Sequence, residues 1–238
     1  IPRYDSNFVD PEAQPDAGSV TAQTVNFEVD TLAISDWRTL AWELPDRVVR
    51  QSRVPLEPEL ARSAGRKMGI YLDDKIIERL RAAADGTGSL PDHIIQLSGG
   101  SNDQITLSDI SEAKKLLKKA NVDTTECYLL VSPDQEKHLI DLDDFKNADK
   151  YGSREALLDG EIGRIYGCRV MSHNGLDDAE AIMYVSDAVG IAVQKDMQFE
   201  ERRSDLKSQK TEYAFSMGAG YVTLEQGVKQ VLLNATGS

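Results

Sequence analysis

The longest regular pattern in this sequence lies between residues 57 and 84. Apolar side chains recur there at steps of three and four residues, the spacing of one face of an α-helix: Leu60, Ala64, Met68, Tyr71, Leu72, Ile76 and Leu80. The pattern ends at the turn-forming run Asp85-Gly86-Thr87-Gly88. At about 1.5 Å per residue, the predicted helix is about 40 Å long. That length is well above the average for a helix, and it constrains the fold of a chain of only 238 residues more than any other feature.

Two segments before this helix alternate between apolar and polar residues, as half-buried strands do. The apolar positions are Val25, Phe27 and Val29 in the first segment and Leu40, Trp42 and Leu44 in the second. We predict that the two strands pair as a long hairpin joined through residues 31–36. A two-stranded ribbon is only marginally stable in water because one face lacks a partner. We therefore expect it to pack on its own domain or to lie on a neighbouring molecule.

From residue 90 onward the sequence has the pattern of an α/β region. A helix is predicted from Ser108, its N-cap, and a second helix from Ser132-Pro133. The continuous apolar run Cys127–Val131 predicts a buried strand. Further strands are predicted over residues 168–172, 181–186 and 189–194, with two more between residues 213 and 233. The two cysteines, Cys127 and Cys168, are too few for a disulfide framework, and we predict free thiols in the core.

The charge balance argues against two classes of binding protein. The chain has 27 Lys and Arg against 40 Asp and Glu, which gives a net charge of −13 and a pI of about 4.7. A general binder of nucleic acids or anionic membranes needs a net basic face. No apolar run approaches the length of about 18 residues that a transmembrane helix needs, so we expect neither a membrane span nor a signal peptide.

No motif in the sequence brings together the side chains of a catalytic or metal site. His93, His138 and His173 are far apart, and none has a second metal ligand at a suitable spacing. The run at residues 98–101 is rich in Ser and Gly but lacks the lysine of a phosphate-binding loop, so we interpret it as a turn. The carboxylate pair at residues 143–144 does not follow the calcium-loop pattern. We therefore predict a protein that is not an enzyme and has no catalytic residue, cofactor or metal ion.

Three stretches of the chain, taken in order, resemble a known family. Residues 127–141 (CYLLVSPDQEKHLID) form a buried strand and a capped helix, and residues 157–174 (LLDGEIGRIYGCRVMSHN) form a glycine-marked turn and strand. Residues 213–233 (YAFSMGAGYVTLEQGVKQVLL) hold the closing strands. Together with the ribbon and the long helix, this order resembles the major capsid (coat) proteins of tailed phages. These proteins share the Hong Kong phage-type shell fold with encapsulins and herpesvirus capsid floors.

The resemblance implies an α+β capsid fold of the Hong Kong phage type. Such a fold has an extended β-hairpin loop, a long spine helix, and peripheral and axial domains. The N-terminal arm and extended loop would occupy residues 1–53. The peripheral domain with the spine helix would comprise residues 54–89 and 196–220, and the axial domain residues 90–195 and 221–238.

The resemblance also implies a function and a location. Copies of the chain would self-assemble as hexamers and pentamers into an icosahedral shell that encloses the double-stranded DNA genome of a tailed phage, without sequence-specific binding. The expected location is the virion capsid, assembled in the host cytoplasm, with portal, scaffold or decoration proteins as further partners and no membrane. Because the chain opens with Ile1 instead of Met, we expect residues to precede it.

Eight residues are candidates for contacts between subunits. They are apolar or aromatic side chains of the predicted ribbon and arginines suited to bidentate pairing with carboxylates: Val25, Phe27, Val29, Trp37, Trp42, Arg47, Arg50 and Arg53. Some members of the family join their subunits through isopeptide bonds that begin at a lysine of the extended loop. Residues 1–66 contain no lysine, so we predict a shell held by non-covalent contacts.

Two alternative functions stay open at this point. An encapsulin-like nanocompartment shell would share the fold but load a cargo enzyme, at a groove near an N-terminal helix that the sequence does not show. An acidic α/β enzyme or ligand-binding protein, with a site near residues 98–102, would form a small oligomer instead of a large particle.

Overall fold

The structure is α+β, as the sequence predicts, and the described strands form three separate sheets. The computed structural model describes residues 2–4, 27–29, 31–53, 55–85, 92–101, 103–141, 163–203 and 209–236. In chain order its elements are β1 (Pro2–Tyr4), β2 (Phe27–Val29), β3 (Asp36–Pro45), α1 (Asp46–Gln51), α2 (Leu56–Ala82), β4 (Ile94–Gln96), α3 (Leu107–Lys119), β5 (Cys127–Val131), α4 (Pro133–Asp141), β6 (Arg164–Ile165), β7 (Cys168–Ser172), β8 (Glu180–Val185), β9 (Val189–Arg203), β10 (Lys210–Thr223), the 3₁₀ turn η2 (Leu224–Gly227) and β11 (Gln230–Asn234).

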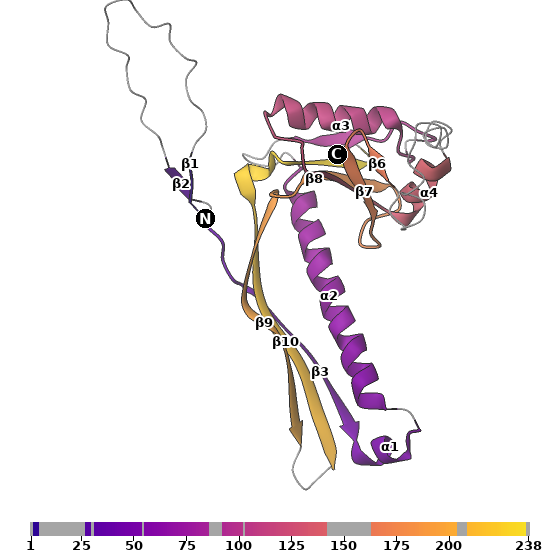
Figure 1. The fold of residues 1–238 in the computed structure, drawn as a ribbon, viewed down its shortest axis with the longest axis vertical. Helices are drawn as coiled ribbons and strands as arrows, with labels where there is room; N and C mark the ends of the chain where they lie inside the picture. Colours follow the sequence, from indigo (N-terminus) through magenta and orange to yellow (C-terminus); the bar gives the residue numbers. More distant parts are fainter. Residues whose placement is uncertain are drawn as a thin grey trace, which may run out of the picture.

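Helix α2 runs along the body of the molecule, from α1 at one end to the six-stranded sheet at the other (Figure 1). It has 27 residues, and both of its ends agree with the predicted helix to within two residues. In its middle, Met68 packs against Met217 and Ala219 of β10. Near its C-terminal end, Ile77 and Leu80 join a core beneath the six-stranded sheet. The helix therefore contributes side chains to two cores.

A three-stranded sheet with the order β3-β10-β9 lies alongside α2 (Figure 1). Its central strand, β10, pairs antiparallel with both neighbours. Because side chains alternate along a strand, Tyr213, Met217 and Ala219 share the face toward α2. There the Tyr213 hydroxyl donates a hydrogen bond to Glu57 Oε1 at 2.6 Å. Burial, together with this hydrogen bond, raises the pKa of Tyr213 to about 12.

The predicted hairpin between residues 25–29 and the strand around Trp42 is wrong. β3 pairs with β10, where Trp42 lies opposite Tyr213, whereas β2 pairs with β1, where Phe27 lies opposite Tyr4. The rings of Trp42 and Tyr213 stack with their centroids 5.6 Å apart. Alternation shows which residues share a face of a strand, but it does not identify the partner strand. Here the partner comes from the far end of the chain.

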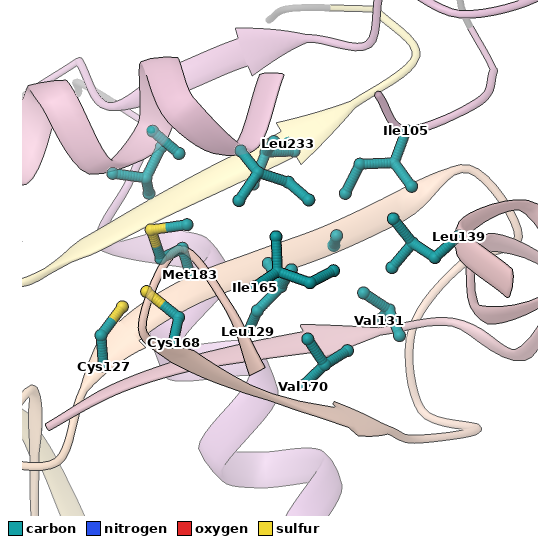
Figure 2. Packing of buried hydrophobic residues seen from close by; sticks show 14 of the residues in the cluster. Ile105, Cys127, Leu129, Val131, Leu139, Ile165, Cys168, Val170, Met183 and Leu233 are labelled. Atoms are coloured by element: carbon teal, nitrogen blue, oxygen red, sulfur yellow. The ribbon is translucent and has the colours of Figure 1, made fainter. Parts of the chain in front are cut away.

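The six-stranded sheet, with the order β4-β11-β8-β5-β7-β6, is buried on both faces along its centre. Leu129 and Val131 of β5 point into a core that Leu139 of α4 also enters (Figure 2), and α3 closes this core with Leu117. Leu130, between them, points to the opposite face and packs in the core that α2 completes. Burial on two faces accounts for the uninterrupted apolar sequence of β5.

Cys127 and Cys168 are free and buried, as predicted. Their sulfur atoms lie side by side on the neighbouring strands β5 and β7 (Figure 2). A hydrogen bond between the two thiols raises the pKa of Cys127 and lowers that of Cys168 to about 7. Within the core both side chains act as small apolar groups.

Side-chain caps set where α3 and α4 begin. Ser132 Oγ accepts the backbone N–H of Gln135 at 3.3 Å, at the predicted start of α4. Helix α3 begins earlier than predicted, because Thr106 and not Ser108 is its N-cap. Thr106 Oγ1 accepts the N–H of Asp109 at 3.4 Å, while the Asp109 carboxylate accepts the N–H of Thr106 at 2.9 Å. This reciprocal pair satisfies two backbone donors at once.

The two longest strands cross two of the predicted domain boundaries. β9 continues through the boundary at residues 195–196, and β10 continues through the one at residues 220–221. The pairing between them shifts register between Ser216 and Ala219, close to the first of these boundaries on the partner strand. The division into peripheral and axial domains stays a prediction.

One ion pair joins the end of α2 to the six-stranded sheet. Arg81 donates two hydrogen bonds to the carboxylate of Glu180, at 2.6 and 2.5 Å. The same carboxylate accepts the backbone N–H of Asp177 at 3.0 Å. The side chain of Glu180 is only 5% exposed, so its charge depends on these partners.

We predict that Glu180→Gln lowers the free energy of unfolding of the unassembled subunit by about 2–3 kcal/mol, because it removes the nearer of the two carboxylates that pair with the Arg81 guanidinium and leaves only Asp177, at 3.8 Å. The matched control is Glu78→Gln, which removes an exposed carboxylate that pairs with Lys75 and should change stability by less than about 1 kcal/mol. Urea unfolding measures both variants. Equal losses would show that the Arg81–Glu180 pair does not join α2 to the sheet.

Candidate subunit interface

Two of the three histidines make local contacts within the fold. Nδ1 of the buried His93 lies 3.1 Å from the backbone oxygen of Gln230, and Nδ1 of His173 accepts the N–H of Gly175 at 2.9 Å. In the part of the chain that the structure describes, no three His, Cys, Asp or Glu side chains lie close enough together to hold a metal ion. None of the described helices is both long and apolar enough to cross a membrane. The carboxylate pair at residues 143–144 lies outside the described residues.

The run at residues 98–101 forms a turn whose backbone donors are already occupied. The N–H of Ser98 donates to Asp109 Oδ2 at 3.1 Å, and the N–H of Ser101 donates to Asp103 Oδ1 at 3.3 Å. An isolated β-bridge between Gly99 and Gln104 closes the turn. A phosphate group would need these N–H groups, so the geometry favours the turn over a phosphate loop.

Trp37 lies on the face of the three-stranded sheet that points away from α2. It pairs with Gly218 of β10, and a Cβ atom at Gly218 would lie 2.8 Å from its ring. The glycine therefore lets the indole lie close against the sheet. The other side of the indole is open, because Trp37 is 55% exposed. A large exposed aromatic group is typical of a surface that another protein covers.

Trp42, by contrast, has its partners within the chain. Its ring stacks on those of Tyr213 and Phe215, with centroids at 5.6 and 6.0 Å, and lies 6.2 Å from that of Phe199. Its Nε1 atom is buried and has no hydrogen-bond partner in the structure. This packing explains Trp42 without a neighbouring subunit.

A row of exposed apolar side chains on β9 escaped the sequence analysis. Ile191, Val193 and Phe199 share the α2 side of the sheet, yet each of them is about half exposed. Because β9 is an edge strand of its sheet, its outer N–H and C=O groups are also open to another chain. The sequence did carry a sign of this row, because large apolar residues stand two positions apart at Ile191 and Val193 and again at Met197 and Phe199. The predicted strand ended too early, at Gln194, to include all of it.

The predicted arginines lie on and just after α1, at the opposite end of α2 from the six-stranded sheet (Figure 1). Arg47, Arg50 and Arg53 are all exposed. The neighbouring Asp46 is paired with Arg203 at 3.0 Å. Within the described segments, none of the three predicted arginines forms an ion pair, so their guanidinium groups are free for another molecule.

The remaining candidates belong to the N-terminal ribbon. Phe27 and Val29 lie in β2, opposite Tyr4 and Pro2 of β1, and Figure 1 shows this ribbon apart from both larger sheets. Val25 lies outside the described residues. The structure thus distributes the described candidates over four places, which are the ribbon, the open face of the sheet with Trp37, the α2 face with Trp42, and the α1 end.

The chain is similar in sequence to one protein family and in fold to several solved capsids. A family model described as phage capsid protein matches residues 10–234. A structure from Mycobacterium phage Che8 has a TM-score of 0.75 and 21% identity, covering 100% of this chain and 85% of that chain. The capsid of cyanophage P-SCSP1u has a TM-score of 0.78 and 16% identity, covering 100% and 84%.

A more distant likeness is to a virus-like particle from Pyrococcus furiosus, with a TM-score of 0.54 and 14% identity over 89% of this chain and 78% of that chain. A search of curated proteins finds no match. At these identities the solved structures show a shared fold, and the family assignment rests on the match to the family model.

The two tryptophans should differ in what they contribute to the isolated subunit. We predict that Trp42→Ala lowers the free energy of unfolding by about 3 kcal/mol, because it removes the centre of an aromatic cluster. Trp37→Ala should lower it by less than about 1 kcal/mol, because the indole is mostly solvated. Urea unfolding of unassembled subunits measures both. A larger loss for Trp37→Ala would contradict the assignment of Trp37 as the open and Trp42 as the internal side chain.

Proposed function

This chain belongs to the phage capsid protein family, and we propose that its copies self-assemble into the icosahedral shell of a tailed phage. It is thus a structural protein of the virion. The family match over residues 10–234 is the observation that carries the proposal. Its surfaces support self-assembly, since an exposed indole, an open apolar edge strand and three unpaired arginines are all unsatisfied in a single copy.

The molecule divides into a body and a projecting ribbon, which is what a closed shell of identical subunits requires. The body is α2 with the two larger sheets, and the ribbon is β1 with β2. In hexamers and pentamers the same interface must accept different angles between subunits. We propose that the body stays fixed and that the part of the predicted arm and extended loop (residues 1–53) that precedes β3 lies on an adjacent subunit and adapts. The assignment of residues 54–89 with 196–220 as peripheral, and 90–195 with 221–238 as axial, belongs to the same proposal.

The acidic charge is compatible with a shell around DNA. A protein with a net charge of −13 does not attract a polyphosphate by its overall field. A shell needs only to enclose the genome, and weak attraction leaves the DNA free to move during packaging and ejection. We propose that the subunit encloses double-stranded DNA without sequence-specific contacts. Assembly in the host cytoplasm, together with portal, scaffold or decoration proteins, is part of this proposal.

A nanocompartment shell is the second candidate. The likeness to a virus-like particle from Pyrococcus furiosus favours it, although its TM-score of 0.54 is below those of the two phage structures, 0.75 and 0.78. Negative-stain microscopy of purified protein distinguishes the candidates. Large particles that package DNA in infected cells support the phage shell, and particles filled with a cargo protein support the nanocompartment. A small oligomer under all conditions would overturn both.

We predict that the shell contains no isopeptide bonds from the extended loop, because residues 1–66 contain no lysine. Purified particles boiled in SDS should migrate as a single band of unlinked chains. A ladder of covalent oligomers, with a cross-linked peptide from residues 1–66 identified by mass spectrometry, would contradict this.

The arginines at the α1 end should stabilise contacts between subunits. We predict that the triple variant Arg47→Ala, Arg50→Ala, Arg53→Ala unfolds like wild type as a free subunit, because none of the three forms an ion pair there. Its particles should dissociate at lower temperature, since arginine pairs bidentately with carboxylates across interfaces.

The matched control for that variant is Arg62→Ala. Arg62 is exposed and is already paired with Glu59, at 3.4 Å. Light scattering during heating measures both sets of particles. Equal dissociation temperatures for the triple variant and wild type would show that the three arginines are solvated charges worth less than about 1 kcal/mol each.

A further inference from the structure

A row of tyrosine and arginine side chains crosses the six-stranded sheet on the face opposite α3, beside the core that α2 completes, against which Tyr184 packs. The register places Arg164 of β6 opposite Arg169 of β7, Arg169 beside Tyr128 of β5, and Tyr128 opposite Tyr184 of β8. Paired residues of neighbouring strands point to the same face. Their sequence neighbours Cys127, Ile165 and Cys168 point the other way, into the core in Figure 2. We call the four side chains the Tyr–Arg row: Arg164, Arg169, Tyr128 and Tyr184.

The two arginines of the row lack a charge partner among the residues that the structure describes. Like charges that lie directly opposite each other on paired strands destabilise the pair. Yet Arg164 and Arg169 occupy such positions, and neither forms an ion pair or a side-chain hydrogen bond in the described part of the chain. Arg164 is exposed and Arg169 partly so. In a single copy, no ion pair among the described residues therefore balances the positive charges of these two arginines.

The two tyrosines place neutral hydroxyl groups beside these arginines. Their rings stack with centroids 5.6 Å apart and planes 21° from parallel, and both residues are only partly buried. Burial raises the pKa of Tyr184, which keeps its hydroxyl protonated and able to donate. The row thus offers two forked guanidinium donors and two hydroxyl donors on one surface.

The turn between β6 and β7 adds an exposed aromatic ring next to the row. Tyr166 has a φ of +50°, followed by Gly167 at +82°. Positive φ at both central residues is the geometry that a two-residue turn between antiparallel strands favours. Tyr166 is 52% exposed, and its carbonyl oxygen accepts a hydrogen bond from Lys114 of α3. The hairpin therefore displays an aromatic side chain at the edge of the sheet.

We propose that the Tyr–Arg row binds carboxylate side chains of a second copy of this chain. Arginine forks match carboxylates in geometry and charge, and Tyr and Arg are enriched among the residues that dominate protein interfaces. A second copy supplies the complementary charge, because each chain carries 40 acidic against 27 basic residues. A nucleic acid would require a broader basic surface. This inference rests on the proposed shell, which brings the second copy to the site.

The test is the double variant Arg164→Glu, Arg169→Glu, with Arg66→Glu, Arg79→Glu as its matched control. Arg66 and Arg79 are exposed on α2 and form no ion pair in the described segments, so both variants change the net charge equally. Sedimentation measures the fraction of protein in particles, and urea unfolding measures the unassembled subunits. We expect the row variant to lose particles at least about tenfold, the control to stay within about twofold of wild type, and both subunits to unfold like wild type.

The outcomes separate this inference from the proposed function. If wild type forms no particles, the proposed shell and this inference both fail. If wild type assembles and the two variants assemble equally well, only the inference fails. A row variant whose subunit is destabilised would show that the row serves its own chain. Normal assembly with reduced nucleic-acid content would show that its partner is DNA. Either of these results overturns the proposal.

A second variant tests the hydroxyl groups alone. Tyr128→Phe keeps the stacked ring and removes one donor from the row. We expect the particle fraction to fall by at least about tenfold, as for loss of one hydrogen bond to a charged group. Unchanged assembly would exclude Tyr128 from the contact.

Discussion

The packing of α2 against both larger sheets is the interaction on which the rest of the structure depends. Met68 contacts β10 of the three-stranded sheet, and Leu80 packs with Ile182 and Leu232 of the six-stranded sheet. The Arg81–Glu180 pair anchors the end of the helix to that second sheet. A helix of 27 residues is thereby a rigid link between two cores that share few other contacts. The long strands β9 and β10 are the other connection, and they run beside the helix.

A capsid subunit performs its function through its surfaces, and several surfaces of this chain are incomplete. The Trp37 indole covers Gly218 but leaves its other side open. β9 ends its sheet with apolar side chains that are about half exposed. The arginines of the α1 end and of the Tyr–Arg row form no ion pair within the part of the chain that the structure describes. These features would be unfavourable in an isolated protein. In an assembly, neighbouring copies can cover the apolar side chains and supply carboxylates for the arginines.

Local patterns in the sequence predicted the elements well. The three- and four-residue spacing located α2 to within two residues, since the helical repeat is a property of consecutive residues. The Ser-Pro start of α4 was correct for the same reason. The start of α3 was missed because two polar residues competed for the N-cap. Thr106 is the N-cap because it forms a reciprocal pair of hydrogen bonds with Asp109. The spacing of the residues alone gives no reason to prefer Thr106 over Ser108.

Local sequence patterns were enough to specify helices α2, α3 and α4, the buried strand β5 and the buried face of the long helix, but not α1, β1 or β4. Only the tertiary structure decided which strands are neighbours, because alternation specifies a face and not a partner. That choice moved Trp42 from a predicted contact surface into an aromatic cluster with β10. It also assembled the Tyr–Arg row from four strands that are separate in the chain. Short-range order follows from the backbone repeat, whereas these sites depend on long-range strand register, which the whole fold sets.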